Sequence, residues 1–289
     1  MSKTIVVMAA GLATRYGGNK QFDGMGPNGE MLMEYTAKDA FDAGFKKLVV
    51  IVPEHVNEAF VNRIRERIDY MEVSFAVQSF DSLPEWFAVP KDRKRPYGTL
   101  DAIICAKDYI QDKFAVVNAD DYYGKQAWGD LCALMDRMSA PNEGCMVTYP
   151  ISSTISGDGA VTRGLCHIEN GQLVSIKETY NLKKHEGAIY CFENESEPVK
   201  IADDTPCSMN IFGFSPELLD PFEDIFNEFL RNTDSNDLDC ECPIPVALGE
   251  LLAKNEIKIS AAPTTSSWFG VTSKEDRAAV VELLRDMKL

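Results

Sequence analysis

The hydrophobic pattern of the first 120 residues alternates short apolar runs with longer amphipathic segments. The runs typical of buried strands are Ile5–Met8, Lys47–Pro53, Val73–Val77 and Phe114–Val117. The segments with helical spacing are Met31–Ala43, which Gly44 ends, Glu54–Asp69 and Thr99–Tyr109. This alternating order predicts a largely parallel sheet whose strands are joined by right-handed crossovers.

The second part of the chain has a different pattern, with shorter strands and a hairpin. Cys145–Pro150 is strand-like, and the runs Gly164–Glu169 and Gln172–Lys177 flank Asn170-Gly171, a dipeptide typical of tight hairpin turns. The later elements are expected at Pro216–Leu230, Pro243–Ala253 and Lys274–Met287 for helices, and at Lys258–Ala262 for a strand. Because the sequence contains no internal repeat and no low-complexity tract, we predict one domain over residues 1–289.

Composition and charge narrow the class of protein. The chain has 289 residues, 45% of them hydrophobic, and a mean hydropathy of −0.18, so it can form a sizeable core. Its net charge of −16 argues against nucleic acid or an anionic membrane as a partner. No apolar run reaches the ~20 residues that span a bilayer. Eight cysteines scattered through mostly apolar surroundings favour reduced thiols in a cytoplasmic protein.

An acidic, turn-rich stretch at 231–242 is the least regular part of the sequence. Leu238 interrupts the ligand pattern that a calcium loop would need. The pair Cys240 and Cys242 lacks a second Cys/His pair nearby, as a zinc site would require. We therefore expect a solvated surface loop here.

A loop with a glycine and two cations follows the first predicted strand. Ile5–Met8 runs into the tripeptide that ends at Gly11, and Arg15 and Lys20 follow. Small residues let backbone amides approach a ligand, and the two cations lie where an anion would bind. The loop predicts a triphosphate site at the carboxyl end of the first strand.

Two standard phosphate-binding motifs do not fit this loop. The P-loop needs a second glycine where Tyr16 stands, and the dinucleotide motif needs its second glycine where Ala13 stands. The sequence instead resembles the signature of sugar-phosphate nucleotidyltransferases. The matching runs are Ala10-Gly11-Leu12-Ala13-Thr14-Arg15, Lys20-Gln21-Phe22, Gly26-Pro27 and Met31-Leu32-Met33-Glu34-Tyr35.

This resemblance implies a fold and a reaction. The fold is α/β, a Rossmann-like three-layer α/β/α arrangement of the nucleotide-diphospho-sugar transferase type with a mixed, mainly parallel central sheet. The enzyme would use Mg²⁺ to form a nucleotide-activated sugar and pyrophosphate from a nucleoside triphosphate (NTP) and a sugar 1-phosphate or related phosphomonoester. Residues 1–140 would be the nucleotide-binding half of the domain, and residues 141–289 the acceptor-binding half with a C-terminal helix.

The resemblance also assigns residues to the nucleotide. Arg15 and Lys20 are the implied catalytic residues, which contact the triphosphate. The implied nucleotide-binding residues are Ala10, Gly11, Leu12, Ala13, Thr14, Gln78, Gly98 and Thr99. Gly98 and Thr99 lie in Pro96-Tyr97-Gly98-Thr99-Leu100-Asp101-Ala102, which resembles the segment on which the base packs in that family. From the residues alone, an ordinary helix start capped by threonine remains an alternative.

The fourth predicted strand ends in Asn118-Ala119-Asp120-Asp121. A carboxylate at the carboxyl end of a buried strand lies at the ligand crevice of an α/β sheet. The run resembles the family's metal-binding turn, which assigns Mg²⁺ to Asp120 and acceptor contact to Asn118; a pair of helix N-cap residues is the alternative. One departure stands out, because Gly270 occupies the place of the family's second metal-binding aspartate. Mg²⁺ would then depend on Asp120, the nucleotide phosphates and water.

Two further runs resemble the acceptor side of the family's site. Ser175-Ile176-Lys177-Glu178-Thr179 resembles a strand end that grips the sugar and its phosphate. Glu178 matches, but threonine replaces the lysine that follows it, so Lys177 or Lys183 would have to substitute. Asn210 lies in a run that resembles the strand closing the sugar side, and a solvated strand-edge residue is its alternative.

The implied reaction is an in-line displacement at the α-phosphorus. Because the attacking phosphate oxygen is already an anion near neutral pH, no general base is needed. Two alternatives remain open. A CTP-dependent transferase for a phosphorylated alcohol such as phosphocholine is compatible with the missing lysine, and Gly270 is compatible with a catalytically inactive nucleotide-sugar-binding or regulatory protein. The base, the acceptor and a homo-oligomeric state are left open as well.

Overall fold

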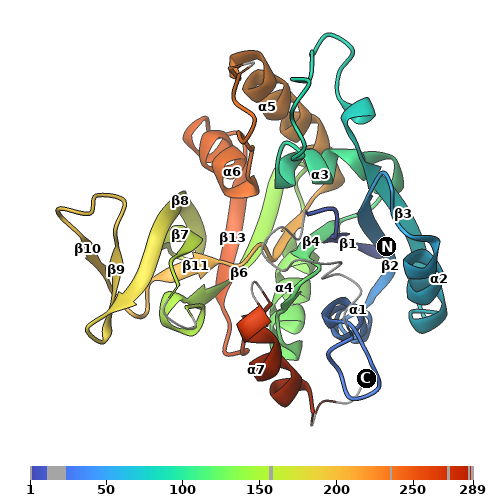
Figure 1. Ribbon diagram of the computed structural model, residues 1–289, viewed down its shortest axis with the longest axis horizontal. Coiled ribbons are helices and arrows are strands. Elements are labelled where there is room, and N and C mark those ends of the chain that lie inside the picture. Colours follow the sequence, from blue (N-terminus) through green and yellow to red (C-terminus); the bar gives the residue numbers. More distant parts are fainter. Residues whose placement is uncertain are drawn as a thin grey trace.

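The computed structural model describes residues 2–11, 24–155, 159–234, 236–271, 274–285 and 287. Its first half contains the predicted alternation of strands and helices (Figure 1). These elements are β1 (Lys3–Met8), α1 (Leu32–Asp42), β2 (Phe45–Pro53), α2 (Glu58–Arg67), β3 (Glu72–Gln78), α3 (Thr99–Cys105) and β4 (Phe114–Asn118). The strands pair in parallel in the order β3-β2-β1-β4, which confirms the expectation for this half.

The remaining strands extend the same sheet. They are β6 (Glu143–Pro150), β7 (Val161–Glu169), β8 (Gln172–His185), β9 (Ala188–Cys191), β10 (Val199–Ile201), β11 (Pro206–Ser208), β12 (Phe212–Phe214) and β13 (Lys258–Pro263). Strand β12 lies antiparallel between β4 and β6 and so joins the two halves into one 12-stranded sheet. A two-stranded ribbon of β5 (Asp121–Tyr122) and β14 (Phe269–Gly270) stands apart from it.

The sheet is mixed and flanked by helices, as predicted, but its parallel share is smaller than expected. Beyond β3-β2-β1-β4, β13 is the only strand in the described part of the chain that runs parallel to a neighbour, β6. The other neighbours in the second half are antiparallel, and hairpins connect β7 to β8, β8 to β9 and β9 to β10. At the predicted hairpin turn, Asn170 and Gly171 have φ values of 50° and 75°, the left-handed conformation that such a turn requires.

Helices cover both faces of the sheet. The later helices are α4 (Lys125–Arg137), α5 (Leu219–Asn232), α6 (Ile244–Ala253) and α7 (Lys274–Leu284), and short 3₁₀ turns lie at Phe80–Ser82, Lys107–Tyr109, Ile151–Ser153 and Pro216–Leu218. In Figure 1, α3, α5 and α6 lie on one side of the central strands, and α1, α2 and α4 lie on the other. Along β1, Ile5 and Val7 face one hydrophobic cluster and Val6 faces the other. Burial on both faces explains why the strand is uninterruptedly apolar.

Helix α4 is the main element that the sequence analysis did not predict. Its buried residues Ala127, Trp128, Leu131 and Met135 have helical spacing, but the helix begins after Gly124 and without a capping side chain. The predicted helix over Thr99–Tyr109 divides into α3 and a 3₁₀ turn. Among the helices that the structure describes, none combines the length and the apolar character needed to cross a membrane.

Candidate active site

A cleft of about 380 Å³ opens at the carboxyl ends of β1 and β4. Eight of its lining residues are ones that the sequence analysis assigned to the site, namely Ala10, Gly11, Gln78, Gly98, Thr99, Asn118, Asp120 and Asn210. They come from segments up to 200 positions apart in the sequence and meet where ligands bind in open α/β sheets. The predicted residues Leu12, Ala13, Thr14, Arg15 and Lys20 lie outside the described residues.

Gly11 forms the part of the cleft wall that follows β1. A Cβ atom placed on Gly11 would meet no described heavy atom within 4 Å. Packing among the described residues therefore does not account for glycine at this position. A glycine at the end of a strand lets a ligand approach the backbone closely.

Gly98 is also constrained by a close contact with the segment at Cys242. Its φ is 103°, and a Cβ atom would lie 2.7 Å from the carbonyl oxygen of Cys242. Backbone hydrogen bonds join the two segments, from Leu100 N to Cys242 O at 3.1 Å and from Cys242 N to Tyr97 O at 2.8 Å. Glycine here permits a close approach between two backbones beside the cleft.

Thr99 does not cap its own helix. The N-cap of α3 is Gly98, which has no side chain to bond, whereas Thr99 Oγ1 accepts a hydrogen bond of 2.9 Å from Ile244 N at the start of α6. The alternative of an ordinary threonine cap on α3 is therefore wrong. The side chain links the cleft wall to the first turn of α6 instead.

Gln78 is held in place by a carboxylate that the sequence analysis did not single out. Its Nε2 donates to Asp101 Oδ2 at 2.6 Å and to the carbonyl of Gly98 at 3.2 Å. Burial raises the pKa of Asp101 to about 6, although the hydrogen bond from Gln78 opposes that shift. Because the amide nitrogen is used twice, Oε1 is the atom of Gln78 that can still contact a base, as an acceptor.

The turn after β4 is held by a chain of side-chain hydrogen bonds. Asn118 Nδ2 donates to Asp121 Oδ2 at 2.8 Å, and Asn210 Nδ2 donates to Asn118 Oδ1 at 3.4 Å. Asp120 lines the cleft, whereas the adjacent Asp121 is buried. The alternative that these aspartates are helix N-caps is wrong, because the N-cap of α4 is Gly124.

The departure at Gly270 has a structural explanation. Gly270 stands opposite Asp121 in the β5–β14 ribbon, and a Cβ atom on Gly270 would overlap Asp121 Oδ1. An aspartate at position 270 cannot fit while the Asp121 carboxylate holds this place. The carboxylate at this point of the ribbon therefore belongs to Asp121 on β5, and position 270 on β14 carries none.

The residues of the cleft fit a metal that arrives with a nucleotide. Among the described residues, no group of three or more His, Cys, Asp or Glu side chains gathers into a ready metal site. Mg²⁺ commonly keeps several waters and binds through one or two carboxylates together with substrate phosphates. A single carboxylate at the cleft wall, that of Asp120, is consistent with such a site.

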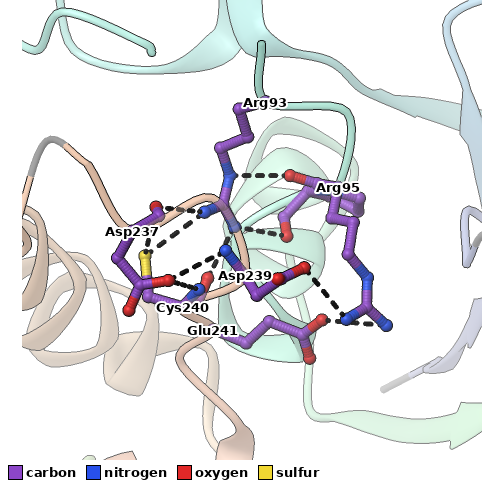
Figure 2. Close-up of polar contacts among 7 residues, drawn as sticks. Arg93, Arg95, Asp237, Asp239, Cys240 and Glu241 are labelled. Atoms are coloured by element: carbon purple, nitrogen blue, oxygen red, sulfur yellow. Dashed lines mark hydrogen bonds and ion pairs between the residues drawn. The ribbon is translucent and has the colours of Figure 1, made fainter.

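Residues 236–239 of the acidic stretch are exposed, as expected of a surface loop. This loop is also anchored to the cleft rim (Figure 2). The buried Arg93 donates to the carbonyls of Asp237 and Cys240 at 3.3 and 2.5 Å, and its guanidinium lies 3.6 Å from the centroid of the Tyr97 ring. Through these contacts Arg93 fixes the loop to the segment that precedes Gly98.

Arg95 and Glu241 line the cleft, and the sequence analysis missed both. Arg95 pairs with Asp239 and with Glu241, each at 3.6 Å. The complementary charges of 91–95 and 234–241 are the sequence signal that could have predicted this contact.

Glu178 does not line the cleft. Its Oε2 is buried and has no hydrogen-bond partner among the described residues. Burial raises the pKa of Glu178, and the charge of Arg163 opposes that rise. Of the two suggested substitute cations, Lys177 lies 3.5 Å from Glu193 and Lys183 lies 4.2 Å from the centroid of the Phe192 ring. Neither lysine lines the cleft.

Comparisons with solved structures identify the fold. A Bacillus anthracis protein assigned as a glucose-1-phosphate thymidylyltransferase, in complex with a sucrose, matches with a TM-score of 0.65 and 10% identity over 100% of this chain and 97% of its own. The inositol-1-phosphate CTP transferase of T. maritima matches with a TM-score of 0.62 and 12% identity, covering 98% and 95%. A UDP-glucose pyrophosphorylase complexed with UDP-glucose matches with a TM-score of 0.60 and 18% identity, covering 98% of each chain.

Sequence comparison identifies the family. No curated protein matches the sequence significantly. The family model described as nucleotidyl transferase matches residues 6–202, which is more than half of the chain. The resemblance read from the motifs is confirmed, and the chain belongs to the nucleotidyl transferase family.

Proposed function

We propose that this protein transfers a nucleotidyl group from an NTP to a sugar 1-phosphate and releases pyrophosphate. The observation that carries the proposal is the convergence of eight motif residues on one cleft at the carboxyl edge of the parallel strands. Membership of the nucleotidyl transferase family supports the reaction class. The sugar 1-phosphate acceptor rests on the sequence resemblance around Glu178 and Asn210.

In this proposal, residues 1–140 bind the NTP. The backbone near Ala10 and Gly11 contacts the phosphates, and Arg15 and Lys20 neutralise the triphosphate charge. Gln78 Oε1 accepts a hydrogen bond from the base, because Asp101 and Gly98 occupy the amide nitrogen. Residues 141–289 complete the domain and bind the acceptor.

Asp120 is the proposed ligand of Mg²⁺. When bound, the metal would neutralise charge on the phosphate oxygens of the nucleotide. Asn118 and Asn210 lie beside Asp120 in the same cleft wall and are the proposed acceptor contacts there.

The proposed chemistry is a single displacement. An oxygen of the acceptor phosphate forms a new bond to the α-phosphorus, the bond from that phosphorus to the bridging oxygen breaks, and pyrophosphate leaves with the electron pair. None of the described cleft-lining residues is a histidine, which suits a nucleophile that needs no general base. The protein's contribution is then alignment of the two phosphates and stabilisation of the departing charge by Arg15 and Lys20.

A second candidate is transfer from CTP to a phosphorylated alcohol. The observation that favours it is threonine rather than lysine at position 179, which alters the acceptor side alone. The Asp121 carboxylate explains why glycine fits at position 270. Because Asp121 is buried and does not line the cleft, an inactive nucleotide-sugar-binding or regulatory protein stays an alternative. We also propose a cytoplasmic location, since all eight cysteines are free thiols.

A pyrophosphate-release assay with the common NTPs, each with Mg²⁺ and with glucose 1-phosphate, inositol 1-phosphate or phosphocholine, tests the proposal. We expect release that requires both substrates and is fastest with a sugar phosphate. Preference for CTP with phosphocholine would support the second candidate. Nucleotide binding without release from any pair would contradict transfer.

A further inference from the structure

Glu241 places a carboxylate in the wall of the cleft, and hydrogen bonds hold the chain on both sides of it. On one side, Cys242 N donates to Tyr97 O at 2.8 Å. On the other side, the carbonyl of Cys240 accepts a hydrogen bond from the buried Arg93. Because the residues immediately before and after Glu241 are fixed, its carboxylate is held at the cleft before any ligand binds.

Arg95 balances the charge of this carboxylate without using up its acceptor capacity (Figure 2). Arg95 Nη2 lies 3.6 Å from Glu241 Oε1, and Nη1 lies 3.6 Å from Asp239 Oδ1. A charge-assisted hydrogen bond would be about 2.7–2.9 Å long, so these are ion pairs at longer range. A carboxylate has about four acceptor sites, and the Glu241 side chain keeps 39% of its surface exposed. It can therefore accept hydrogen bonds from a ligand.

The negative charge of Glu241 indicates which part of an NTP lies beside it. Like charges repel, so a carboxylate in the cleft wall is unfavourable next to the triphosphate. The next residue, Cys242, packs its backbone against Gly98, and Gln78 lines the same cleft. The resemblance assigns both Gly98 and Gln78 to the nucleotide, with Gly98 in the segment on which the base packs. Glu241 therefore borders the uncharged base.

Gln78 contributes a second acceptor to the same part of the cleft. A carbonyl oxygen can only accept, so the hydrogen bond of 3.2 Å to the carbonyl of Gly98 requires Nε2 of Gln78 on that side. Asp101 Oδ2 accepts from the same nitrogen at 2.6 Å. The orientation of the Gln78 amide is thereby fixed, and Oε1 is left as an acceptor. The cleft thus presents two acceptors to a base, Gln78 Oε1 and the Glu241 carboxylate.

The bases of the common NTPs differ in the donors that they offer to these two acceptors. Uracil and thymine have a single N–H on the edge away from the ribose, and carbonyl oxygens lie on either side of it. Cytosine, adenine and guanine have an exocyclic amino group with two N–H bonds. A carbonyl oxygen placed against Glu241 would leave the carboxylate without a donor and would face it with a like partial charge, and both effects oppose binding.

We propose that Glu241 is a specificity-determining residue that acts with Gln78 to select NTPs whose base carries an exocyclic amino group over UTP and dTTP. This inference rests on the proposed function and specifies its nucleotide. Arg95 is a positioning residue, because it acts through Glu241 by balancing the charge of the carboxylate and restricting its movement.

The experiment measures NTP binding by calorimetry in the absence of an acceptor. Three pairs of ligands differ in the amino group, namely CTP and UTP, ATP and ITP, and GTP and ITP. We expect the wild type to bind the amino-bearing member of at least one pair at least tenfold more tightly than its partner, and more tightly than UTP and dTTP. Glu241→Gln should reduce this preference to about threefold or less, because its amide can also donate to a carbonyl oxygen.

Further variants separate base selection from a structural role. Glu241→Ala should weaken binding of the amino-bearing nucleotide alone, whereas Glu241→Gln should also bind its partner more tightly than the wild type does. Arg95→Met should narrow the preference, and Arg95→Lys should keep most of it. Glu250→Gln, which changes an exposed glutamate on α6 that does not line the cleft, is the matched control and should bind as the wild type does. Melting curves check that each variant is folded.

Two results would overturn base selection by Glu241. They are binding of UTP or dTTP at least as tight as that of every amino-bearing NTP, and an unchanged preference in Glu241→Gln. Pyrophosphate release that is fastest with UTP or dTTP would keep the transfer reaction and refute the selection. A preference that depends on Glu241, without pyrophosphate release from any pair of substrates, would keep the selection and refute the transfer reaction.

Discussion

The cleft at β1 and β4 and the β5–β14 ribbon position their polar groups in different ways. In the cleft, the groups stand on loops that leave the strands at one edge of the sheet, so short contiguous motifs carry them. In the ribbon, Asp121 on β5 stands opposite Gly270 on β14 through antiparallel register. The comparison teaches that short motifs locate the cleft residues, whereas a pairing between distant strands leaves no contiguous pattern in the sequence.

The largest expected effect concerns the loop after β1. Lys20→Ala removes a cation that we assign to the leaving pyrophosphate, so turnover should fall on the order of 10²–10³-fold. The melting temperature should stay near that of the wild type. Steady-state pyrophosphate release measures the effect, and near-normal turnover would remove Lys20 from the donor site.

The next prediction concerns Gly270 in the β5–β14 ribbon. Gly270→Asp should destabilise the protein by about 3 kcal/mol, because the new side chain overlaps the Asp121 carboxylate and repels it. The double variant Gly270→Asp/Asp121→Gly should recover most of that loss. Urea unfolding measures the free energy of unfolding of both variants. If the double variant loses as much stability as the two single substitutions together, the two carboxylates do not compete for one place, and this explanation of Gly270 is contradicted.

A third prediction concerns the backbone approach beside the cleft. Gly98→Ala should cost about 2–3 kcal/mol, because φ is 103° and the new Cβ would lie 2.7 Å from Cys242 O. Gly29→Ala is the matched control, since φ there is 79° and no described atom lies within 4 Å. The control should cost about 1 kcal/mol. Equal losses in the two variants would show that the contact with Cys242 has no energetic role.

The last stability prediction is a pH dependence due to Asp101. Burial raises the pKa of this carboxyl from 3.8 to about 6 in the folded protein. Its contribution to stability is therefore full below about pH 3.8 and is lost as the pH rises through 6. The free energy of unfolding of the wild type, relative to Asp101→Asn, should fall by about 2–3 kcal/mol between pH 4 and pH 7.

Denaturant unfolding at both pH values measures this difference. The exposed Asp108→Asn is the control, and it should show no comparable change relative to the wild type. A relative stability of Asp101→Asn that stays constant over this range would contradict the raised pKa of Asp101.

The sequence predicted the parallel half of the fold well, because strands buried on both faces are continuously apolar. Helix α4 was missed because Gly124 provides no capping signal. The short strands β9 to β12 have too few residues for a clear alternation, so their pairing comes from tertiary contacts.

Part of the candidate site was likewise predictable and part was not. Contiguous motifs predicted that Gly11, Gly98 and Asp120 belong to the site. The hydrogen bond from Gln78 to Asp101 joins residues 23 positions apart, and the sequence analysis did not predict it. Thr99 and Ile244 meet because the start of α3 packs beside the start of α6. No short sequence pattern indicates that these residues are in contact.

The most direct test of the donor site is pyrophosphate release by Asp120→Asn. With a saturating NTP, a sugar 1-phosphate and Mg²⁺, we predict a rate on the order of 10²-fold or more below that of the wild type. The exposed control Asp108→Asn should retain full release. Release by Asp120→Asn at the wild-type rate would contradict a nucleotidyl-transfer site at the carboxyl ends of β1 and β4.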